Sequence, residues 1–150
     1  MTKRQQGRAF ELRIEKYLEK LGYRVETAHP VLQFIGPGKV RSKSHDFFGL
    51  LDIWAIHPGK QEQLLIQATI SPDGASAKRK ELEGWPWRPG RDQLQVWCRD
   101  PGSPQLIRVW CRLGMSAAGE VHWEEALVRP SKPSWPQSVL GPPPDPENRS

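Results

Sequence analysis

The fold is decided by residues 50–70, whose sequence is LLDIWAIHPGKQEQLLIQATI. Two runs rich in Leu and Ile, residues 50–56 and 64–70, flank a polar stretch that contains Pro58 and Gly59. Apolar runs of this length, bounded by turn residues, are typical of buried strands. The sequence therefore predicts a hairpin of two well-buried strands in a central sheet.

The sequence on either side of this hairpin predicts further helices and strands. Apolar residues repeat at helical spacing over residues 7–22, and Gly22 predicts the end of that helix. The other predicted elements are a strand at 23–27, a Gly/Pro-interrupted connection at 29–44, a short basic helix at 75–83 and a second hairpin at 94–99 and 106–113. Residues 121–128 fit either a strand or a short helix. This order predicts an α/β fold with a mixed central sheet flanked by helices.

The length of 150 residues is that of one ordinary globular domain. Residues 130–150 are rich in Pro and poor in apolar side chains, which predicts a disordered tail that contributes nothing to the core. The domain is then expected at residues 1–129. No apolar run approaches the roughly 18 residues of a membrane span, and two cysteines make no disulfide framework. We expect a cytoplasmic protein without a membrane partner.

The net charge of +5 is unevenly distributed. Residues 1–45 contain ten Lys and Arg against four Glu, a net charge of +6, and the remaining residues carry −1. A concentrated positive charge suits a polyanion such as nucleic acid, because phosphate neutralisation releases counterions. A solvated basic surface explains the same charge equally well.

Two polar residues interrupt the central hairpin, Asp52 and Gln67. If the turn is the four residues 58–61, the antiparallel register places Asp52 directly opposite Gln67, with Cβ atoms about 5 Å apart. Thr69 shares a face with Gln67. In the first helix, Glu11 lies at the border of the apolar arc, so it can add a third oxygen if this helix packs over the sheet. The alternatives are a hydrogen-bonded pair of Asp52 with Gln67, and a Glu11 side chain that extends into water.

Oxygen ligands of this kind suit a hard divalent cation, and Mg²⁺ takes one or two carboxylates together with water and substrate phosphates. We therefore predict that Asp52, Gln67 and Glu11 hold Mg²⁺, for which Mn²⁺ can substitute. A zinc site is not expected, because no His or Cys residues are suitably grouped. Asp46 is a possible auxiliary ligand or, alternatively, a turn residue before Gly49.

The order of these residues resembles the PD-(D/E)XK nuclease superfamily, and within it the archaeal-type Holliday junction resolvases and their phage relatives. The resemblance covers about residues 7–83. It implies a restriction-endonuclease-like fold, with Glu11 as the helix glutamate, Asp52 as the metal aspartate and Gln67 at the acidic position. It also implies a homodimer that cuts four-way DNA junctions. Such a protein would act in a bacterial, archaeal or phage-infected cell.

Thr69 departs from the pattern, because it stands where the family has Lys. A hydroxyl can orient a water but adds no positive charge at the reacting phosphate. Lys43, Lys78 and Lys80 are candidates to supply that charge. We include Thr69 with Glu11, Asp52 and Gln67 as the predicted catalytic set.

The predicted function is Mg²⁺-dependent hydrolysis of phosphodiesters in branched DNA by an endodeoxyribonuclease. Two alternatives remain open: a DNA-binding module that does not cut, and a restriction-type or end-processing nuclease on the same fold. The predicted phosphate contacts are basic residues of three segments, Arg4 and Arg8, then Lys39, Arg41 and Lys43, then Lys78, Arg79 and Lys80.

Seven tryptophans are present. Three of them, Trp54, Trp97 and Trp110, lie in apolar strand segments and are expected in the core. Trp85 and Trp87 lie in a Pro-rich loop between basic residues, where they can meet DNA or a second subunit, or pack back on the domain.

Overall fold

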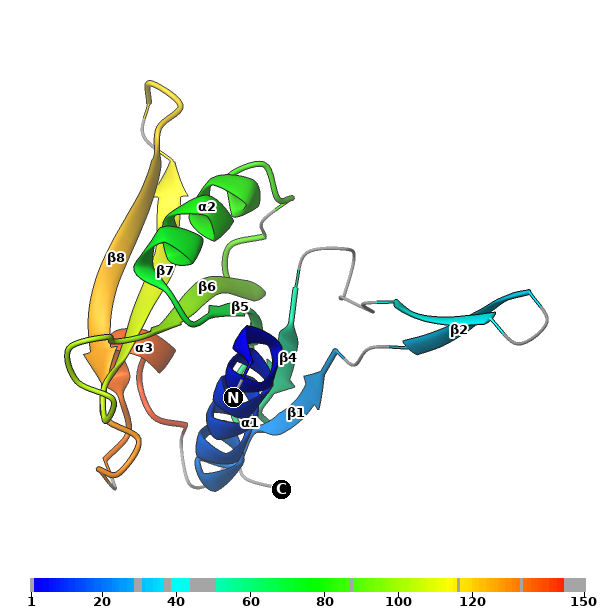
Figure 1. Cartoon of the computed structure of the whole chain (residues 1–150). Coiled ribbons are helices and arrows are strands. Elements are labelled where there is room, and N and C mark those ends of the chain that lie inside the picture. The colour runs from blue at the N-terminus through cyan, green and yellow to red at the C-terminus, as the bar shows by residue number, and fades with distance from the viewer. Residues whose placement is uncertain are drawn as a thin grey trace.

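A computed structural model describes residues 2–28, 31–36, 39–43, 51–86, 88–115, 117–132 and 134–144, with the backbone alone at 31–36, 39–43 and 115. The fold is α/β, with a six-stranded mixed sheet and helices packed against it (Figure 1). Its elements, in chain order, are α1 (Lys3–Lys20), β1 (Arg24–Thr27), β2 (Val31–Gly36), β3 (Lys39–Lys43), β4 (Ile53–Ile56), β5 (Gln63–Thr69), α2 (Pro72–Leu82), β6 (Asp92–Arg99), β7 (Ile107–Met115), β8 (Val121–Val128) and α3 (Gln137–Leu140).

The large sheet has the strand order β1-β4-β5-β6-β7-β8. Strands β5 and β6 run parallel and are connected through α2, whereas each other neighbouring pair is antiparallel. Strands β2 and β3 form a separate antiparallel ribbon (Figure 1). The predicted central hairpin is confirmed as β4 and β5, and the segment at 121–128 is a strand.

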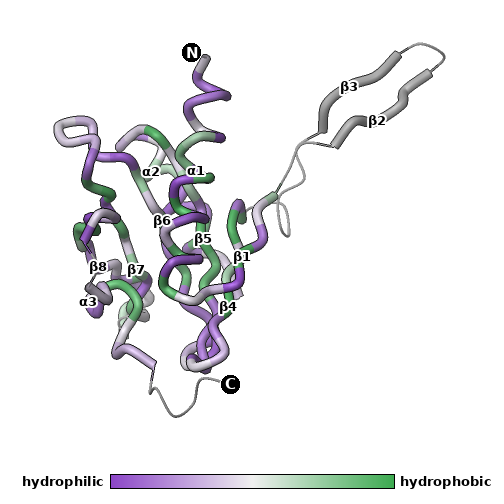
Figure 2. Tube along the Cα trace, turned by 90° about the horizontal axis from the view of Figure 1, so that it is seen from below, coloured by the Kyte–Doolittle hydropathy of each residue, from purple (hydrophilic) through white to green (hydrophobic). Residues whose placement is uncertain are grey.

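Consecutive apolar residues of the central strands point to opposite faces of the sheet, so each face has its own core. Figure 2 shows hydrophobic residues along the strands of the sheet. On one face, Ile53, Ile66 and Trp97 pack with the apolar residues of α1. On the other face, Leu65, Leu94 and Val96 pack with Ala75 and Leu82 of α2. These surfaces are called the α1 face and the α2 face below.

Both main helices begin earlier than the apolar spacing predicts, because polar residues cap them. The Thr2 side chain accepts from the Gln5 N–H at 3.2 Å, and the Gln5 side chain accepts from the Thr2 N–H, which extends α1 back to Lys3. The Ser71 hydroxyl accepts from the Gly74 N–H at 3.1 Å and Pro72 occupies the first turn of α2. Among the described helices, none is sufficiently long and apolar to cross a membrane.

The C-terminal segment contradicts the prediction of a tail that contributes nothing to the core. Residues 137–140 form α3, which buries Val139 and Leu140 in the α1-face core. The buried Gln95 Nε2 donates to the Val139 carbonyl at 2.8 Å. A few well-placed apolar residues are thus sufficient to fix a segment whose average composition is polar. Residues 145–150 lie outside the described part of the chain.

Aromatic residues fix the approach to α3. The Trp135 ring stacks on Tyr23 and meets His57 edge-on, at centroid distances of 6.1 and 5.9 Å. The Gly59 N–H donates to His57 Nδ1 at 2.9 Å, and His57 Nε2 lies 3.2 Å from the Leu21 carbonyl. With Nδ1 as an acceptor, the proton belongs on Nε2, so both ring nitrogens of a neutral histidine are used.

We expect Leu140→Ala to lower the free energy of unfolding by about 2–5 kcal/mol, because a fully buried leucine is replaced by a cavity. Urea denaturation followed by circular dichroism measures the change. The exposed Ser138→Ala provides the control in the same helix, and equal stability of the two variants would contradict the packing of α3.

Stability is also expected to fall at alkaline pH. Burial raises the pKa of Tyr17 from 10.0 to about 12, and burial followed by the charge of Glu124 raises the pKa of Cys111 from 9.0 to about 12. Above about pH 9 the unfolded chain loses protons that the folded chain retains, so the free energy of unfolding falls until about pH 12. Urea midpoints at pH 8 and pH 11 test this, and Tyr17→Phe should show a smaller fall between them.

Candidate functional site

Asp52 lies immediately before β4, where three strands meet. Its carbonyl accepts from the Ala28 N–H at 2.9 Å, and its N–H donates to the Ile66 carbonyl at 3.0 Å. Its carboxylate Oδ2 accepts from the Ala68 N–H of β5 at 2.9 Å. A side-chain oxygen here replaces a backbone acceptor, so Asp52 links the ends of β1, β4 and β5.

The strand ladder is irregular at Asp52. Ile53 pairs with Ile66, and in a regular antiparallel ladder the N–H of the preceding residue does not donate to that same Ile66 carbonyl. Leu51 and Ile53 also pack on opposite faces of the sheet, although residues two apart in a regular strand share a face. Irregularities of this kind re-aim side chains and recur beside active sites.

Gln67 is next to this position on β5 and is only 2% exposed. The register of Trp54 with Leu65 and Ala55 with Leu64 is the predicted one and continues to Ile53 opposite Ile66, after which the irregularity at Asp52 interrupts it. The bond from the Ala68 N–H places the carboxylate beside the residue that follows Gln67. The Asp52 carboxylate therefore lies beside β5 at the residue next to Gln67, but the strand pairing that was predicted to oppose the two side chains stops at Ile53.

Thr69 lies on the α2 face, the face to which β5 also directs Gln67, as predicted. Its hydroxyl oxygen lies at the beginning of α2. Thr69 Oγ1 lies 3.4 Å from the Ser71 nitrogen and would contact any side chain added at Gly74. Gly74 therefore permits the close approach of this threonine to the helix. The interaction gives Thr69 a structural role beside its predicted catalytic one.

Glu11 belongs to α1, on the face of the sheet opposite the one to which β5 directs Gln67. Its side chain is 21% exposed, and Oε2 lies 3.5 Å from Arg8 Nη1. This ion pair with Arg8 supplies one partner for the half-buried carboxylate. Asp52 lies between the two faces, whereas Glu11 and Gln67 approach the sheet from opposite sides.

The donor set of Asp52 and Gln67 fits the chemistry of Mg²⁺, because one carboxylate and one amide oxygen leave positions for water and phosphate. Within the described residues, no three His, Cys, Asp or Glu side chains cluster as a metal site. Gln67 does not count toward such a cluster, because its side chain is an amide. Asp46, the predicted auxiliary ligand, is outside the described residues.

The predicted phosphate contacts differ in their surroundings. Arg4 is exposed at the start of α1, and Lys80 is exposed on α2. Arg79 instead lies against the sheet, with its Cζ 4.4 Å from the Trp110 ring centroid, a cation–π contact. Lys39, Arg41 and Lys43 occupy alternate positions of β3, as expected for an extended segment, and their side chains are outside the described part.

Trp54 corrects the expectation of three core tryptophans. Trp97 is fully buried, whereas Trp54 is 40% exposed because α2 packs over β5 and β6 and leaves the α2 face of β4 open. Trp54 lines a cleft of about 790 Å³ together with Gln63, Leu65, Trp85, Pro86, Arg88 and Asp92. This cleft was not predicted from the sequence, because Gln63 and Asp92 meet only through the pairing of β5 with β6.

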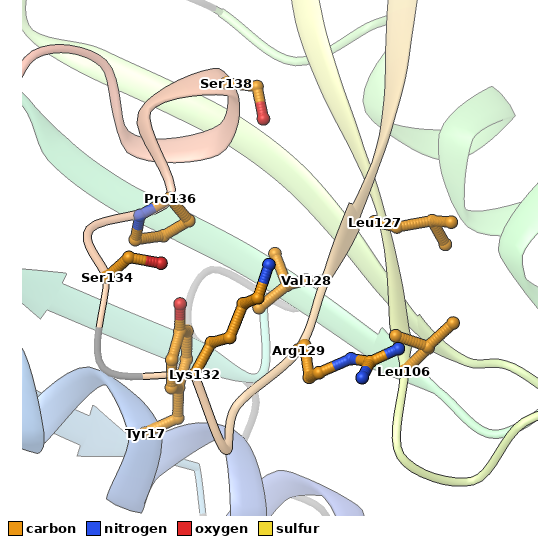
Figure 3. Close-up of a pocket in the computed structure, with 9 residues that line it drawn as sticks. All are labelled: Tyr17, Leu106, Leu127, Val128, Arg129, Lys132, Ser134, Pro136 and Ser138. Carbon is orange, nitrogen blue, oxygen red and sulfur yellow. The ribbon is translucent and has the colours of Figure 1, made fainter.

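A second hollow of about 480 Å³ lies between α1, β8 and the C-terminal segment (Figure 3). The side chains of Arg129 and Lys132 line it, and the Tyr17 hydroxyl points toward the C-terminal segment. Asp52, Gln67 and Glu11 are not among its lining residues. This hollow is therefore separate from the candidate site.

Comparison of the chain with models of known protein families, with curated proteins and with solved structures finds no match.

We expect Asp52→Ala to lower the free energy of unfolding by about 1–3 kcal/mol, because it removes the acceptor of the Ala68 N–H. Asp52→Asn retains a side-chain oxygen at that position and should remain within about 1 kcal/mol of the wild type. Urea denaturation compares the two variants, with the exposed Glu81→Ala as control. An equal loss of unfolding free energy in Asp52→Ala and Asp52→Asn would show that this hydrogen bond does not stabilise the junction.

Proposed function

We propose that the chain is a Mg²⁺-dependent endodeoxyribonuclease of restriction-endonuclease-like fold that cuts branched DNA, in particular four-way junctions. The observation that carries this proposal is the Asp52 carboxylate held where β4 meets β5 by the N–H of Ala68, which is next in sequence to the buried Gln67. The mixed sheet with a main helix on each face is the arrangement that the resemblance to PD-(D/E)XK nucleases implies.

In this proposal Asp52 and Gln67 hold the metal. Glu11, the predicted third ligand, would have to reach the ion from the α1 face and leave its ion pair with Arg8. The bound ion would polarise the scissile phosphate and lower the pKa of a water that attacks it. The chain's own residues fix where this happens, because the Ala68 N–H holds the Asp52 carboxylate beside β5, at the residue that follows Gln67. Basic residues of α1, α2 and β3 would contact the DNA phosphates without reading the bases.

The resemblance also leads us to propose a homodimer. Two copies related by a two-fold axis would place two sites against the opposed strands of a four-way junction. Each copy would then nick one strand.

A DNA-binding module that does not cut is the second candidate function. The surroundings of Thr69 favour it, because its hydroxyl is engaged at the start of α2 and brings no positive charge to the site. Such a module would bind junctions with a steep dependence on salt and would need no metal.

The nuclease proposal is tested by incubating a labelled four-way junction with the protein and Mg²⁺ or Mn²⁺. We expect symmetric nicks from the wild type. Asp52→Asn should reduce the rate more than about 100-fold, because loss of a residue that only supports a metal ligand already costs about 10- to 100-fold.

The matched control for Glu11→Gln is Glu15→Gln, one turn further along α1. Linear duplex and flap substrates in the same assay separate junction cleavage from restriction-type or end-processing activity. Cleavage that is unchanged in both Asp52→Asn and Glu11→Gln would overturn the site assignment. Tight junction binding without product from the wild type would favour the non-cutting module.

A further inference from the structure

The Trp54 cleft holds an exposed aromatic ring on a rigid support. Trp54 Nε1 donates to Gln63 Oε1 at 2.8 Å, and Gln63 Nε2 donates to Asp92 Oδ1 at 2.8 Å. Arg88 Nε donates to the other carboxylate oxygen of Asp92 at 3.3 Å. Asp92 is only 2% exposed, so a desolvated carboxylate anchors a chain of hydrogen bonds that ends on a surface indole.

This anchoring fixes the orientation of Trp54 without burying its ring. A buried carboxylate is costly unless it is paired, and here both of its oxygens serve to hold residues of the cleft. The core of the α2 face does not include Trp54, because its apolar cluster is formed by other residues, among them Leu51, Leu65 and Leu94. The arrangement presents a flat, pre-oriented aromatic surface at the protein surface.

The cleft adjoins the candidate site along the same two strands. Trp54 is two residues after Asp52 on β4, and its partner Leu65 is two residues before Gln67 on β5. Two residues of a strand span about 7 Å. A nucleic acid strand that reaches Asp52 can therefore place a neighbouring base in the cleft.

The residues that line the Trp54 cleft favour a ligand with a planar ring and polar edges. Trp54 and Trp85 supply aromatic surface, and the Arg88 side chain, 59% exposed, supplies a cation. Aromatic rings and arginine planes are the groups on which unpaired bases stack. A volume of about 790 Å³ lies in the range of small-ligand pockets. A base inside a duplex is stacked between its neighbours, so only an unpaired base can use such a surface.

We propose that the Trp54 cleft binds one unpaired nucleobase of single-stranded DNA, as found at the open centre of a branched substrate. The inference rests on the proposed action on branched DNA and adds a contact that distinguishes single strands from duplex. An apolar protein segment is a less suitable occupant, because it would not use the cation at the cleft or the fixed edge of the indole.

The test uses the full chain in EDTA, so that binding is measured without cleavage. Fluorescence anisotropy compares a labelled 15-nucleotide dT oligonucleotide with a blunt duplex of the same length. We expect Trp54→Ala to weaken binding of the single strand about 5- to 100-fold, the effect of removing one base-stacking contact, and to leave duplex binding unchanged. Trp54→Phe retains a ring and should lose less.

Ile56→Ala is the matched control, because Ile56 is exposed on the same strand two residues further along. Urea denaturation checks that each variant is folded. Equal affinity of wild type and Trp54→Ala for the single strand, or an equal loss for single strand and duplex, would overturn the inference. This readout does not depend on cleavage. If the wild type binds the single strand through Trp54 but never cuts a junction, the nuclease proposal is refuted and the base-binding inference stands.

Discussion

The bond between the Asp52 carboxylate and the Ala68 N–H is the interaction on which the organisation of this sheet depends. At this point β1, β4 and β5 meet, and Asp52 contributes its carbonyl, its N–H and its side chain to the junction. The chain also changes faces here, since Leu51 packs under α2 and Ile53 under α1. One residue thus connects the two cores of the domain and provides the carboxylate of the candidate metal site. Any ion held there would depend on the same geometry that holds the strands.

Local patterns predicted the parts of the fold that depend on neighbouring residues. The pairing of β4 with β5 followed from a short turn and two apolar runs, and the structure has that register. The helices also followed from periodicity, but their starts did not, because caps such as Ser71 act outside the apolar pattern. The C-terminal segment was predicted wrongly, since its composition does not reveal that two residues of α3 fill a gap against β6 and β8.

The candidate site, like the fold, has parts that the sequence predicted and parts that it did not. The approach of Asp52 to β5 near Gln67 could be predicted from the sequence, because antiparallel pairing gives the register of β4 with β5. The irregularity at Asp52, which ends that register, could not. The relation of Glu11 to these two residues depends on which face α1 covers, and helical periodicity alone does not determine that. The Trp54 cleft required knowledge of a parallel pairing between Gln63 and Asp92 across the α2 connection, and of the strip of sheet that α2 leaves uncovered. Both depend on packing between distant segments.

The return of the C-terminal segment to the start of the chain has a consequence for biosynthesis. Lys60 Nζ donates to the Pro142 carbonyl at 2.8 Å, and Trp135 covers Tyr23 and His57, so segments made earlier are completed by a segment made later. A growing polypeptide therefore displays an unfilled apolar groove until α3 has emerged from the ribosome. Prematurely terminated products retain that groove, which marks them for chaperones and proteases. Recognition of the chain by quality control is in this way coupled to the synthesis of α3.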